Sequence, residues 1–512
     1  MKLTRWLWLI LLAILAAACL GTATPPPPTA APTLPPPTES SQTPVPTVAA
    51  DTPSPLDHLE TARSFNPLPA MADIEELTSD RYDGRRAGTE GEPEAARYLA
   101  RRMAALGLAP IGDNDTYFQS FDIPFRDLAS QPVLEILEVD GGSHVFQLRR
   151  DFREYVFGPA GPGQAEGEAL YAVRGTTADL RDLQVDGNIV VVNSAQGRID
   201  IAAVADRAVL GGAEGLIILT ANAESIRVKG SYLDTFGRTI PVFLAGPSVA
   251  EALAEAAGLT MADLDSQSFA TGVQVRMELA LQAQRRARSQ NVVGLWPGTD
   301  ADLDHLVVII GGHYDHVGRD PDGTLFPGAN DNASGVSVAV AVAQHLIEAG
   351  FVPQIGLLFV GWGAEEAGLL GSEYYVQNPL FPLEDTLAVI NMDVVGQGRG
   401  GGVAITETAG PLEQLLSAWG EDLGISATTV PDHGASDQAP FNRRGVPASH
   451  LGWEGFDGLI HVAADDFEGI DVMKIQAVGQ LVALAVMELA TEPALIRELA
   501  RLPDGQESLL LS

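Results

Sequence analysis

Cysteine and basic side chains are scarce in this sequence. Its 512 residues include one cysteine, Cys19, so no disulfide can form within the chain. Lysine and arginine total 31 against 67 aspartate and glutamate residues, a formal net charge of −36. A chain this acidic repels nucleic acid and anionic lipid headgroups, so we expect no nucleic-acid partner. Aromatic residues are also few, but hydrophobic residues make up 46% and are sufficient for a globular core.

The N-terminus has the pattern of an export signal. Lys2 and Arg5 precede an apolar run, Trp6 to Ala18, which is too short to span a bilayer comfortably. We therefore predict a signal peptide over residues 1–18. The segment Leu15 to Cys19 resembles the lipidation box of bacterial lipoproteins, which predicts lipidation at Cys19 and a cell-surface or periplasmic lipoprotein. Because Ala16 stands where leucine is commonest, cleavage after Ala18 and free secretion is the alternative.

Proline, threonine, serine and alanine dominate residues 19–69, with runs such as Pro25 to Pro28. Such a composition cannot bury a core and favours extended conformations. We predict a disordered tether here, which would hold the folded part at the membrane through the lipid on Cys19.

The remaining chain divides into four segments by pattern. Residues 70–122 form the first part of a catalytic domain and include a helix from Glu94 to Leu106. Residues 123–284 alternate short β-rich runs with Gly/Pro turns and are predicted to be an inserted β-rich domain without metal ligands. Residues 285–490 alternate buried strands and helices, which predicts an α/β fold with a doubly wound, mixed sheet. Residues 491–512 are predicted to be a weakly ordered tail.

Chemically useful side chains follow the buried strands of this last part. The run Leu306 to Ile310 leads into His313 and Asp315, the run Ile355 to Val360 leads into Glu365 and Glu366, and the run Leu387 to Met392 leads into Asp393. The carboxyl ends of strands form the ligand crevice of open α/β sheets, so we expect these side chains to converge. Asp331, in a loop before a helix, and His461, after Leu459 and Ile460, are two further candidates.

These residue types suit a catalytic zinc site. Zinc takes imidazole and carboxylate ligands, and two ions about 3.5–4 Å apart can share a bridging carboxylate and a water molecule. Asp315 is two residues from His313 and is expected to accept the second imidazole N–H. Glu365 and Glu366 are adjacent and project differently, so one can bind metal while the other faces the attacking water.

Four sequence blocks resemble the zinc-dependent exopeptidase family of bacterial leucyl aminopeptidases, aminopeptidase Y and glutamate carboxypeptidase. They are His313–Asp315, Gly328–Gly335, Ala364–Ser372 and Asn391–Asp393, in the family's order. The resemblance implies two Zn²⁺ ions, with His313, Glu366, Asp393 and His461 as terminal ligands and Asp331 as the bridge. It also implies Glu365 as general base, peptide substrates cleaved from the N-terminus, and a protease-associated domain as the insertion.

The sequence departs from that family at two places. Ile460 stands where members often carry a tyrosine that stabilises the oxyanion, and Ser436-Asp437-Gln438 replaces a common Ser-Asp-His. The motifs leave open a carboxypeptidase, a single-zinc glutaminyl cyclase, or a binding ectodomain that has lost the metals.

Outside the ligand set, we interpret His316, His345 and His433 as ordinary surface or supporting residues. His450, Asp437 and Asp465 are candidates for the pocket wall, and Trp362 is expected in the core.

Overall fold

The computed structural model describes residues 56–499, except 139–140, 195–196, 198, 231, 233–234, 262, 264–266, 409 and 456–459. The predicted signal peptide, Cys19 and most of the predicted tether therefore lie outside the described residues. Residues 500–512 of the predicted tail lie outside them as well.

The larger layer of the fold is a nine-stranded mixed sheet. Its strand order is β1-β13-β15-β14-β16-β19-β17-β18, and β2 also pairs with β13. The strands are β1 (Ala109–Pro110), β2 (Phe118–Phe125), β13 (Arg285–Trp296), β14 (Val307–His313), β15 (Gly356–Trp362), β16 (Thr386–Met392), β17 (Val403–Thr406), β18 (Ala427–Val430) and β19 (Ala448–Trp453). The central strands β15, β14, β16 and β19 run parallel. This order confirms the predicted α/β class with a mixed sheet.

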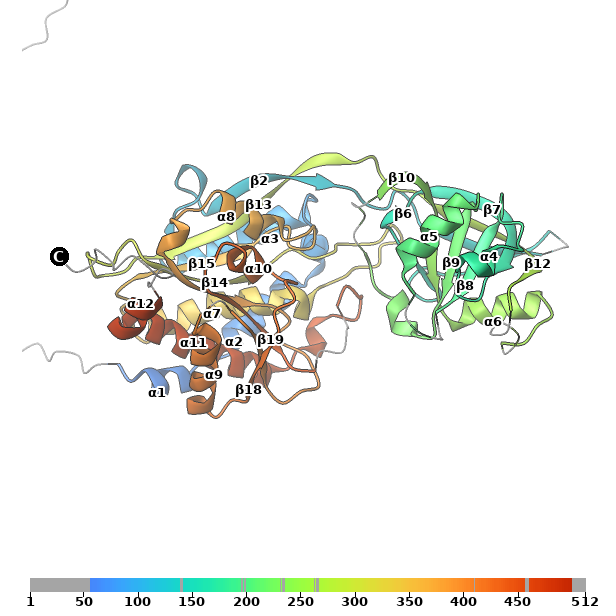
Figure 1. The fold of residues 1–512 in the computed structure, drawn as a ribbon. Helices are drawn as coiled ribbons and strands as arrows, with labels where there is room; N and C mark the ends of the chain where they lie inside the picture. The colour runs from blue at the N-terminus through green and yellow to red at the C-terminus, as the bar shows by residue number, and fades with distance from the viewer. Residues whose placement is uncertain are drawn as a thin grey trace, which may run out of the picture. The chain divides into compact units, whose positions relative to one another are not determined.

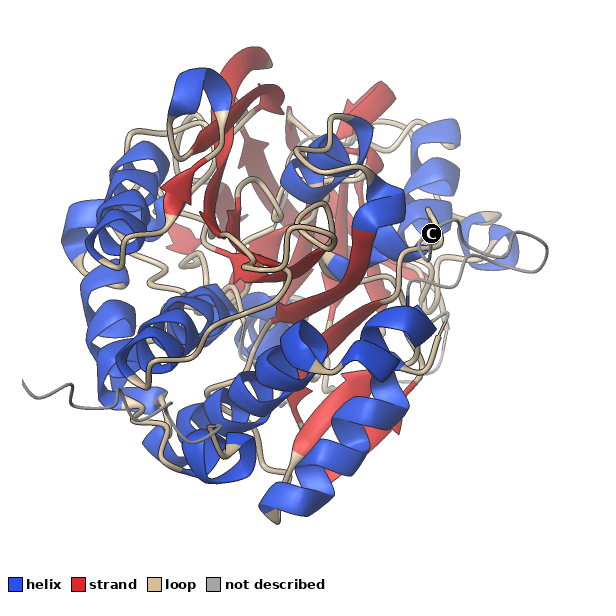
Figure 2. Ribbon diagram, turned by 90° about the vertical axis from the view of Figure 1, so that its left-hand side faces the viewer, coloured by secondary structure: helices blue, strands red, loops and turns tan. Residues whose placement is uncertain are grey.

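Helices cover both faces of this sheet (Figure 2). They are α1 (His58–Arg63), α2 (Leu68–Leu77), α3 (Gly91–Ala105), α7 (Ser334–Glu348), α8 (Leu370–Gln377), α9 (Leu412–Leu423), α10 (Gln438–Asn442), α11 (Val472–Thr491) and α12 (Pro493–Leu499). Successive side chains of a strand point to opposite faces. Val308 and Ile310 of β14 accordingly pack in the core with α7 and α11, whereas Ile309 packs on the other face with residues of α8 and α10.

Helix α11 is the one helix in the described part of the chain that is long and apolar enough to cross a membrane. Most of its side chains are buried, including Leu481, Val482 and Leu484, and it packs against α7 and α9. It therefore belongs to the core of the larger layer, where its apolar character is explained by burial on several sides.

The chain between β2 and β13 forms a second sheet, coloured cyan to yellow-green in Figure 1. Its order is β4-β3-β12-β7-β8-β9-β11-β5, and β6 and β10 form a separate pair. The elements are β3 (Val133–Leu137), β4 (Ser143–Val145), β5 (Phe152–Glu154), β6 (Gly158–Ala160), β7 (Gly163–Tyr171), α4 (Thr177–Leu180), β8 (Ile189–Asn193), α5 (Ile201–Leu210), β9 (Gly215–Leu219), β10 (Thr235–Ile240), β11 (Val242–Ala245), α6 (Pro247–Ala256) and β12 (Phe269–Leu279). It has two hydrophobic cores of its own, one on the side of α5 and one on the side of α6.

Two predicted boundaries differ from the structure at the ends of the folded part. Helix α1 lies inside the predicted tether, because Ala62 and Phe65 are buried in the large core and anchor this segment. Helix α12 lies inside the predicted tail, where Ile496 is buried in the same core. Both helices are short, and only a few of their side chains enter the core.

Candidate metal centre

Three strand ends bring the first group of predicted ligands to one edge of the large sheet. In the parallel register, His313 at the end of β14 is opposite Trp362 at the end of β15, and Gly311 is opposite Asn391 of β16. Glu365 and Glu366 follow β15, and Asp393 follows β16 directly. The expected convergence at the carboxyl ends of the strands is therefore present.

Asp331 is held in place by another acidic residue, Asp465. The segment η5 (Ala329–Ala333) precedes α7, and the backbone N–H groups of Asn330 and Asp331 donate to the Asp465 carboxylate at 2.8 and 3.0 Å. Asn332, rather than Asp331, accepts the N–H of Gly335 in the first turn of α7. The side chain of Asp331 is therefore not used as a helix cap and is available to the site.

The first cluster consists of His313, Asp393, Glu365 and one oxygen of Asp331. His313 Nε2 lies 3.2 Å from Asp331 Oδ1, 3.4 Å from Asp393 Oδ1 and 3.9 Å from Glu365 Oε2. All four side chains are buried or nearly so.

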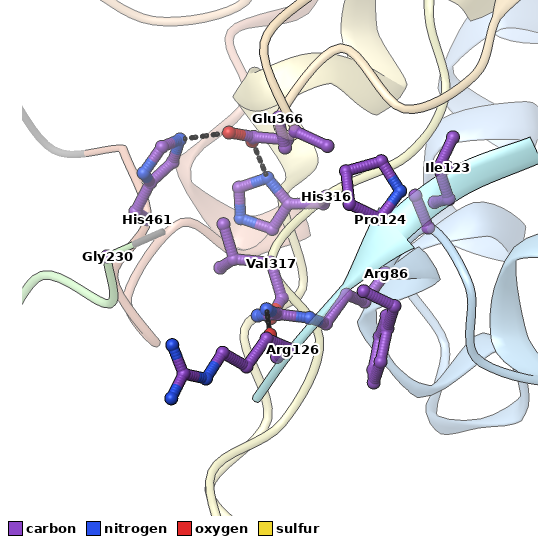
Figure 3. A pocket seen from close by; sticks show the side chains of 12 residues that line it. Arg86, Ile123, Pro124, Arg126, Gly230, His316, Val317, Glu366 and His461 are labelled. Carbon is purple, nitrogen blue, oxygen red and sulfur yellow. Dashed lines mark hydrogen bonds and ion pairs between the residues drawn. The ribbon is translucent and has the colours of Figure 1, made fainter. Parts of the chain in front are cut away.

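The second cluster consists of His461, Glu366, His316 and the other oxygen of Asp331. His461 Nε2 lies 2.8 Å from Glu366 Oε2 and 3.1 Å from Asp331 Oδ2. His316 Nδ1 lies 3.0 Å from Glu366 Oε1 and 3.7 Å from Asp331 Oδ2. Figure 3 shows Glu366 between the two imidazoles, one on each side of its carboxylate.

Asp331 therefore has one oxygen in each cluster. Its Oδ1 is directed to His313, and its Oδ2 is directed to His461. A carboxylate placed in this way can bind two cations at once, one through each oxygen. The ligand atoms of His313, Glu365 and Asp393 lie within 4.8 Å of one another, and so do those of His316, Asp331, Glu366 and His461. Each set is close enough to surround one ion.

The ionisable groups of the site strongly perturb one another. Burial lowers the pKa of His461, but the carboxylates of Glu366 and Asp331 outweigh burial and hold that pKa well above 6.5. Burial raises the pKa of Asp331, but hydrogen bonds with His313 and His461 outweigh it and bring the pKa well below 3.8. The pKa of Glu365 is instead raised, well above 4.5. Burial and the nearby carboxylates of Glu366 and Asp437 raise it, and they outweigh the opposing effect of His313.

The donor set fits divalent cations such as zinc. Imidazole nitrogens and carboxylate oxygens are the zinc ligands of catalytic sites. Several of these atoms are buried without a hydrogen-bond partner in the protein: both ring nitrogens of His316, Oε1 of Glu366 and Oδ1 of Asp393. Buried polar atoms left without partners are costly, and cations bound in the two clusters would give a partner to Asp393 Oδ1, to Glu366 Oε1 and to one ring nitrogen of His316.

The structure places Asp315 in a different contact from the one expected. Its carboxylate accepts the backbone N–H groups of Glu365 and Glu366 at 2.9 and 3.3 Å. His313 Nδ1 lies 3.1 Å from the Asp315 carbonyl oxygen and 3.8 Å from its carboxylate. Asp315 thus fixes the glutamate loop with its side chain and the imidazole with its backbone.

For His316 the sequence left a surface role and a supporting role open, and the structure excludes the surface role. His316 is fully buried within the second cluster and is not a surface residue. His433 is exposed, as expected, and His345 contacts the carbonyl of Thr61. A histidine three positions after His313 gave no separate signal, because only the fold of the following loop turns its ring toward Glu366.

Of the three candidate wall residues, His450 and Asp437 lie next to the first cluster. His450 Nε2 is 3.0 Å from the carbonyl oxygen of Asp393. Asp437 is buried, accepts a hydrogen bond from Ser372 and has one oxygen without a partner. Trp362 packs in the core against Tyr375, as expected.

Arg85 was not identified as a functional candidate from the sequence. Its side chain is completely buried and donates hydrogen bonds to the carbonyl oxygens of Tyr314, Pro327 and Gly328. These contacts connect the segment after β14 with the loop that carries Asp331. Burial lowers the pKa of Arg85 to about 10, which leaves it charged at neutral pH.

A cavity that is open to solvent lies beside the second cluster. Glu366, His316 and His461 line one side of it, and Ile123 of β2 lines another (Figure 3). Phe125 of the same strand also lines the cavity. A substrate in this cavity would lie directly against the cluster, with an apolar wall available for a side chain.

Comparisons with known proteins agree with this geometry. The sequence profile of "Peptidase family M28" matches residues 291–486, the segment that carries every predicted ligand. The aminopeptidase YwaD of Bacillus subtilis (strain 168) is 26% identical over 445 residues, covering 85% of this chain and 87% of that protein.

Two solved structures share the fold. An aminopeptidase from Aneurinibacillus sp. strain AM-1 superposes with a TM-score of 0.61 at 21% identity, covering 85% of this chain and 96% of that one. BSAP, a zinc aminopeptidase from Bacillus subtilis, superposes with a TM-score of 0.60 at 21% identity, covering 84% and 96%. The segment that carries the predicted ligands and both clusters, residues 291–486, is therefore similar to peptidase family M28.

Proposed function

We propose that this protein is a zinc-dependent aminopeptidase that removes residues from the N-terminus of peptides. The observation that carries the proposal is Asp331, whose two oxygens reach two separate ligand clusters. Support for the choice of metal and reaction comes from the Bacillus subtilis relative, an aminopeptidase similar over 85% of this chain, and from the zinc aminopeptidase that shares the fold.

Two zinc ions would be held by His313 and Asp393 on one side and by Glu366 and His461 on the other, with Asp331 between them. When bound, such ions polarise a carbonyl group and make a water molecule more acidic. The loops that carry these ligands are held by hydrogen bonds of Asp465, Asp315 and Arg85. These three residues would therefore position the ligands.

Glu365 is the proposed general base. Its carboxylate lies 3.9 Å from His313 Nε2, beyond hydrogen-bond distance, and is available to exchange a proton with water. Burial raises its pKa well above 4.5, and a basic carboxylate is a better proton acceptor. Glu365 would take the proton of the attacking water and deliver it to the leaving nitrogen of the peptide.

The second sheet is proposed to be an inserted protease-associated domain that shapes access to the cavity. Gly230 from this sheet's chain segment lines the cavity, and the Lys229 backbone N–H donates to the His461 carbonyl at 2.9 Å. For localisation, we propose export and anchoring through a lipid on Cys19, supported by the signal-like run before it.

A peptide panel together with metal analysis tests this function. The purified protein is expected to contain close to two zinc ions per chain and to cleave peptides with a free N-terminus but not the same peptides with an acetylated N-terminus. Cleavage that depends on a free C-terminus instead would indicate a carboxypeptidase. Conversion of N-terminal glutamine without peptide hydrolysis, with one zinc per chain, would indicate a glutaminyl cyclase. Absence of both metal and hydrolysis would indicate a binding ectodomain.

A further inference from the structure

We propose that His316 is an additional ligand of the second metal ion, beside Glu366, His461 and Asp331; this inference rests on the proposed two-ion site. It adds a third imidazole to a centre for which the sequence predicts two.

The geometry of the second cluster carries this inference. His316 Nδ1 is as close to Glu366 as a hydrogen-bonded group, at 3.0 Å, and His461 Nε2 lies on the other oxygen of the same carboxylate at 2.8 Å. The two imidazole rings are 5.4 Å apart between centroids and nearly perpendicular. Two nitrogens and two carboxylates within 4.8 Å of one another form a complete set of four donors.

The bonding of His316 also points to a missing partner. The side chain is fully buried, and neither ring nitrogen has a properly oriented hydrogen-bond partner in the protein. Its backbone is fixed, because its N–H donates to the Arg85 carbonyl at 3.2 Å.

A ligand role differs from a supporting role in a measurable way. If His316 only donates an N–H to Glu366, then an asparagine, whose amide nitrogen falls near the position of Nδ1, would replace it. If His316 binds the ion, asparagine would not replace it, because an amide nitrogen is not a zinc ligand. His316→Asn, His316→Ala and the exposed control His433→Asn therefore form one series.

Zinc content and affinity are measured in this series by competition with a chelating dye, using zinc alone as the probe. We expect His316→Asn and His316→Ala to bind one ion as the wild type does and the other ion at least tenfold more weakly, with His433→Asn unchanged. Equal binding of two ions by the wild type and His316→Asn would contradict the ligand role of His316 but not the proposed two-ion function. A wild-type protein with a single ion, held equally by His316→Asn, would contradict both this inference and the proposed two-ion function.

X-ray absorption at the zinc edge of the wild-type protein gives a second readout that does not depend on the stability of a variant. Three imidazoles shared by two ions average to 1.5 nitrogens from histidine per zinc, whereas His313 and His461 alone average to one. A crystal structure of the zinc-loaded protein with a His316 nitrogen about 2.1 Å from the ion would confirm the assignment. A His316 ring beyond bonding distance, with an average of one imidazole per zinc, would overturn it.

Discussion

The buried carboxyl group of Glu92 gives a quantitative prediction about how the stability of the fold around the candidate site depends on pH. This residue lies in the first turn of α3, is fully buried, and accepts hydrogen bonds from the Ser289 hydroxyl and from the Gly88 N–H at 2.9 Å. The Tyr314 hydroxyl is also near, at 3.5 Å, which connects Glu92 to the segment that carries His313. Burial is the largest effect and raises the pKa of Glu92 from 4.5 to about 7, although these hydrogen bonds oppose it.

Because the pKa of Glu92 is raised in the folded protein, the free energy of unfolding depends on pH. Between pH 4.5 and 7 the folded protein holds a proton on Glu92 that the unfolded chain has lost, so stability falls as pH rises through this range. At about 1.4 kcal/mol per pH unit, the interval from 4.5 to about 7 corresponds to about 3 kcal/mol. Glu92→Gln removes the ionisation and with it this slope.

The assay compares urea unfolding of the wild type and Glu92→Gln from pH 4.5 to pH 8, followed by tryptophan fluorescence. We expect the variant to gain about 3 kcal/mol of stability relative to the wild type between the two ends of this range. A penalty for turning an amide toward the Gly88 N–H would shift the whole difference curve without changing its slope. Glu90→Gln, at the exposed residue directly before the same helix, is the matched control. A difference between Glu92→Gln and wild type that stays constant with pH would refute the reasoning.

Three further predictions concern the reaction, the second sheet and the N-terminus. Glu365→Gln is expected to keep the metal content and melting temperature but to lower kcat by about 10²- to 10⁴-fold, and near-normal turnover would exclude Glu365 as the base. Deleting residues 123–284 removes the Lys229 N–H from the His461 carbonyl, so we expect weaker binding of the second zinc ion as well as altered peptide preference. Unchanged zinc affinity would show that this contact does not position His461. Cys19→Ser is expected to move the protein from the membrane fraction to the soluble fraction, and mass spectrometry that finds an unmodified Cys19 in the wild type would contradict the anchor.

Much of the larger layer could be predicted from local pattern. The continuous apolar runs around Val308, Leu358 and Val389 are buried on both faces, and such runs are readable because every side chain in them is hydrophobic. In the second sheet, the predicted strand Gly215–Leu219 agrees with the structure for the same reason. The predicted strand Val133–Leu137 agrees as well, but its side chains alternate between buried and partly exposed positions. The helices α1 and α12 were missed because only a few of their side chains enter the core.

The sequence by itself determined which residues could carry the chemistry, because strand ends and family-like blocks fix the residue types and their order along the chain. Only the tertiary structure decided how they meet. The two oxygens of Asp331 lie near His313 and His461 because of the conformation of its loop and the contact with Asp465, which is 134 residues away in the sequence. The burial of His316 beside Glu366 depends equally on segments that no local pattern connects. Distances of 3 Å between residues far apart in the sequence result from the packing of the whole layer, and that packing is a property of the folded chain alone.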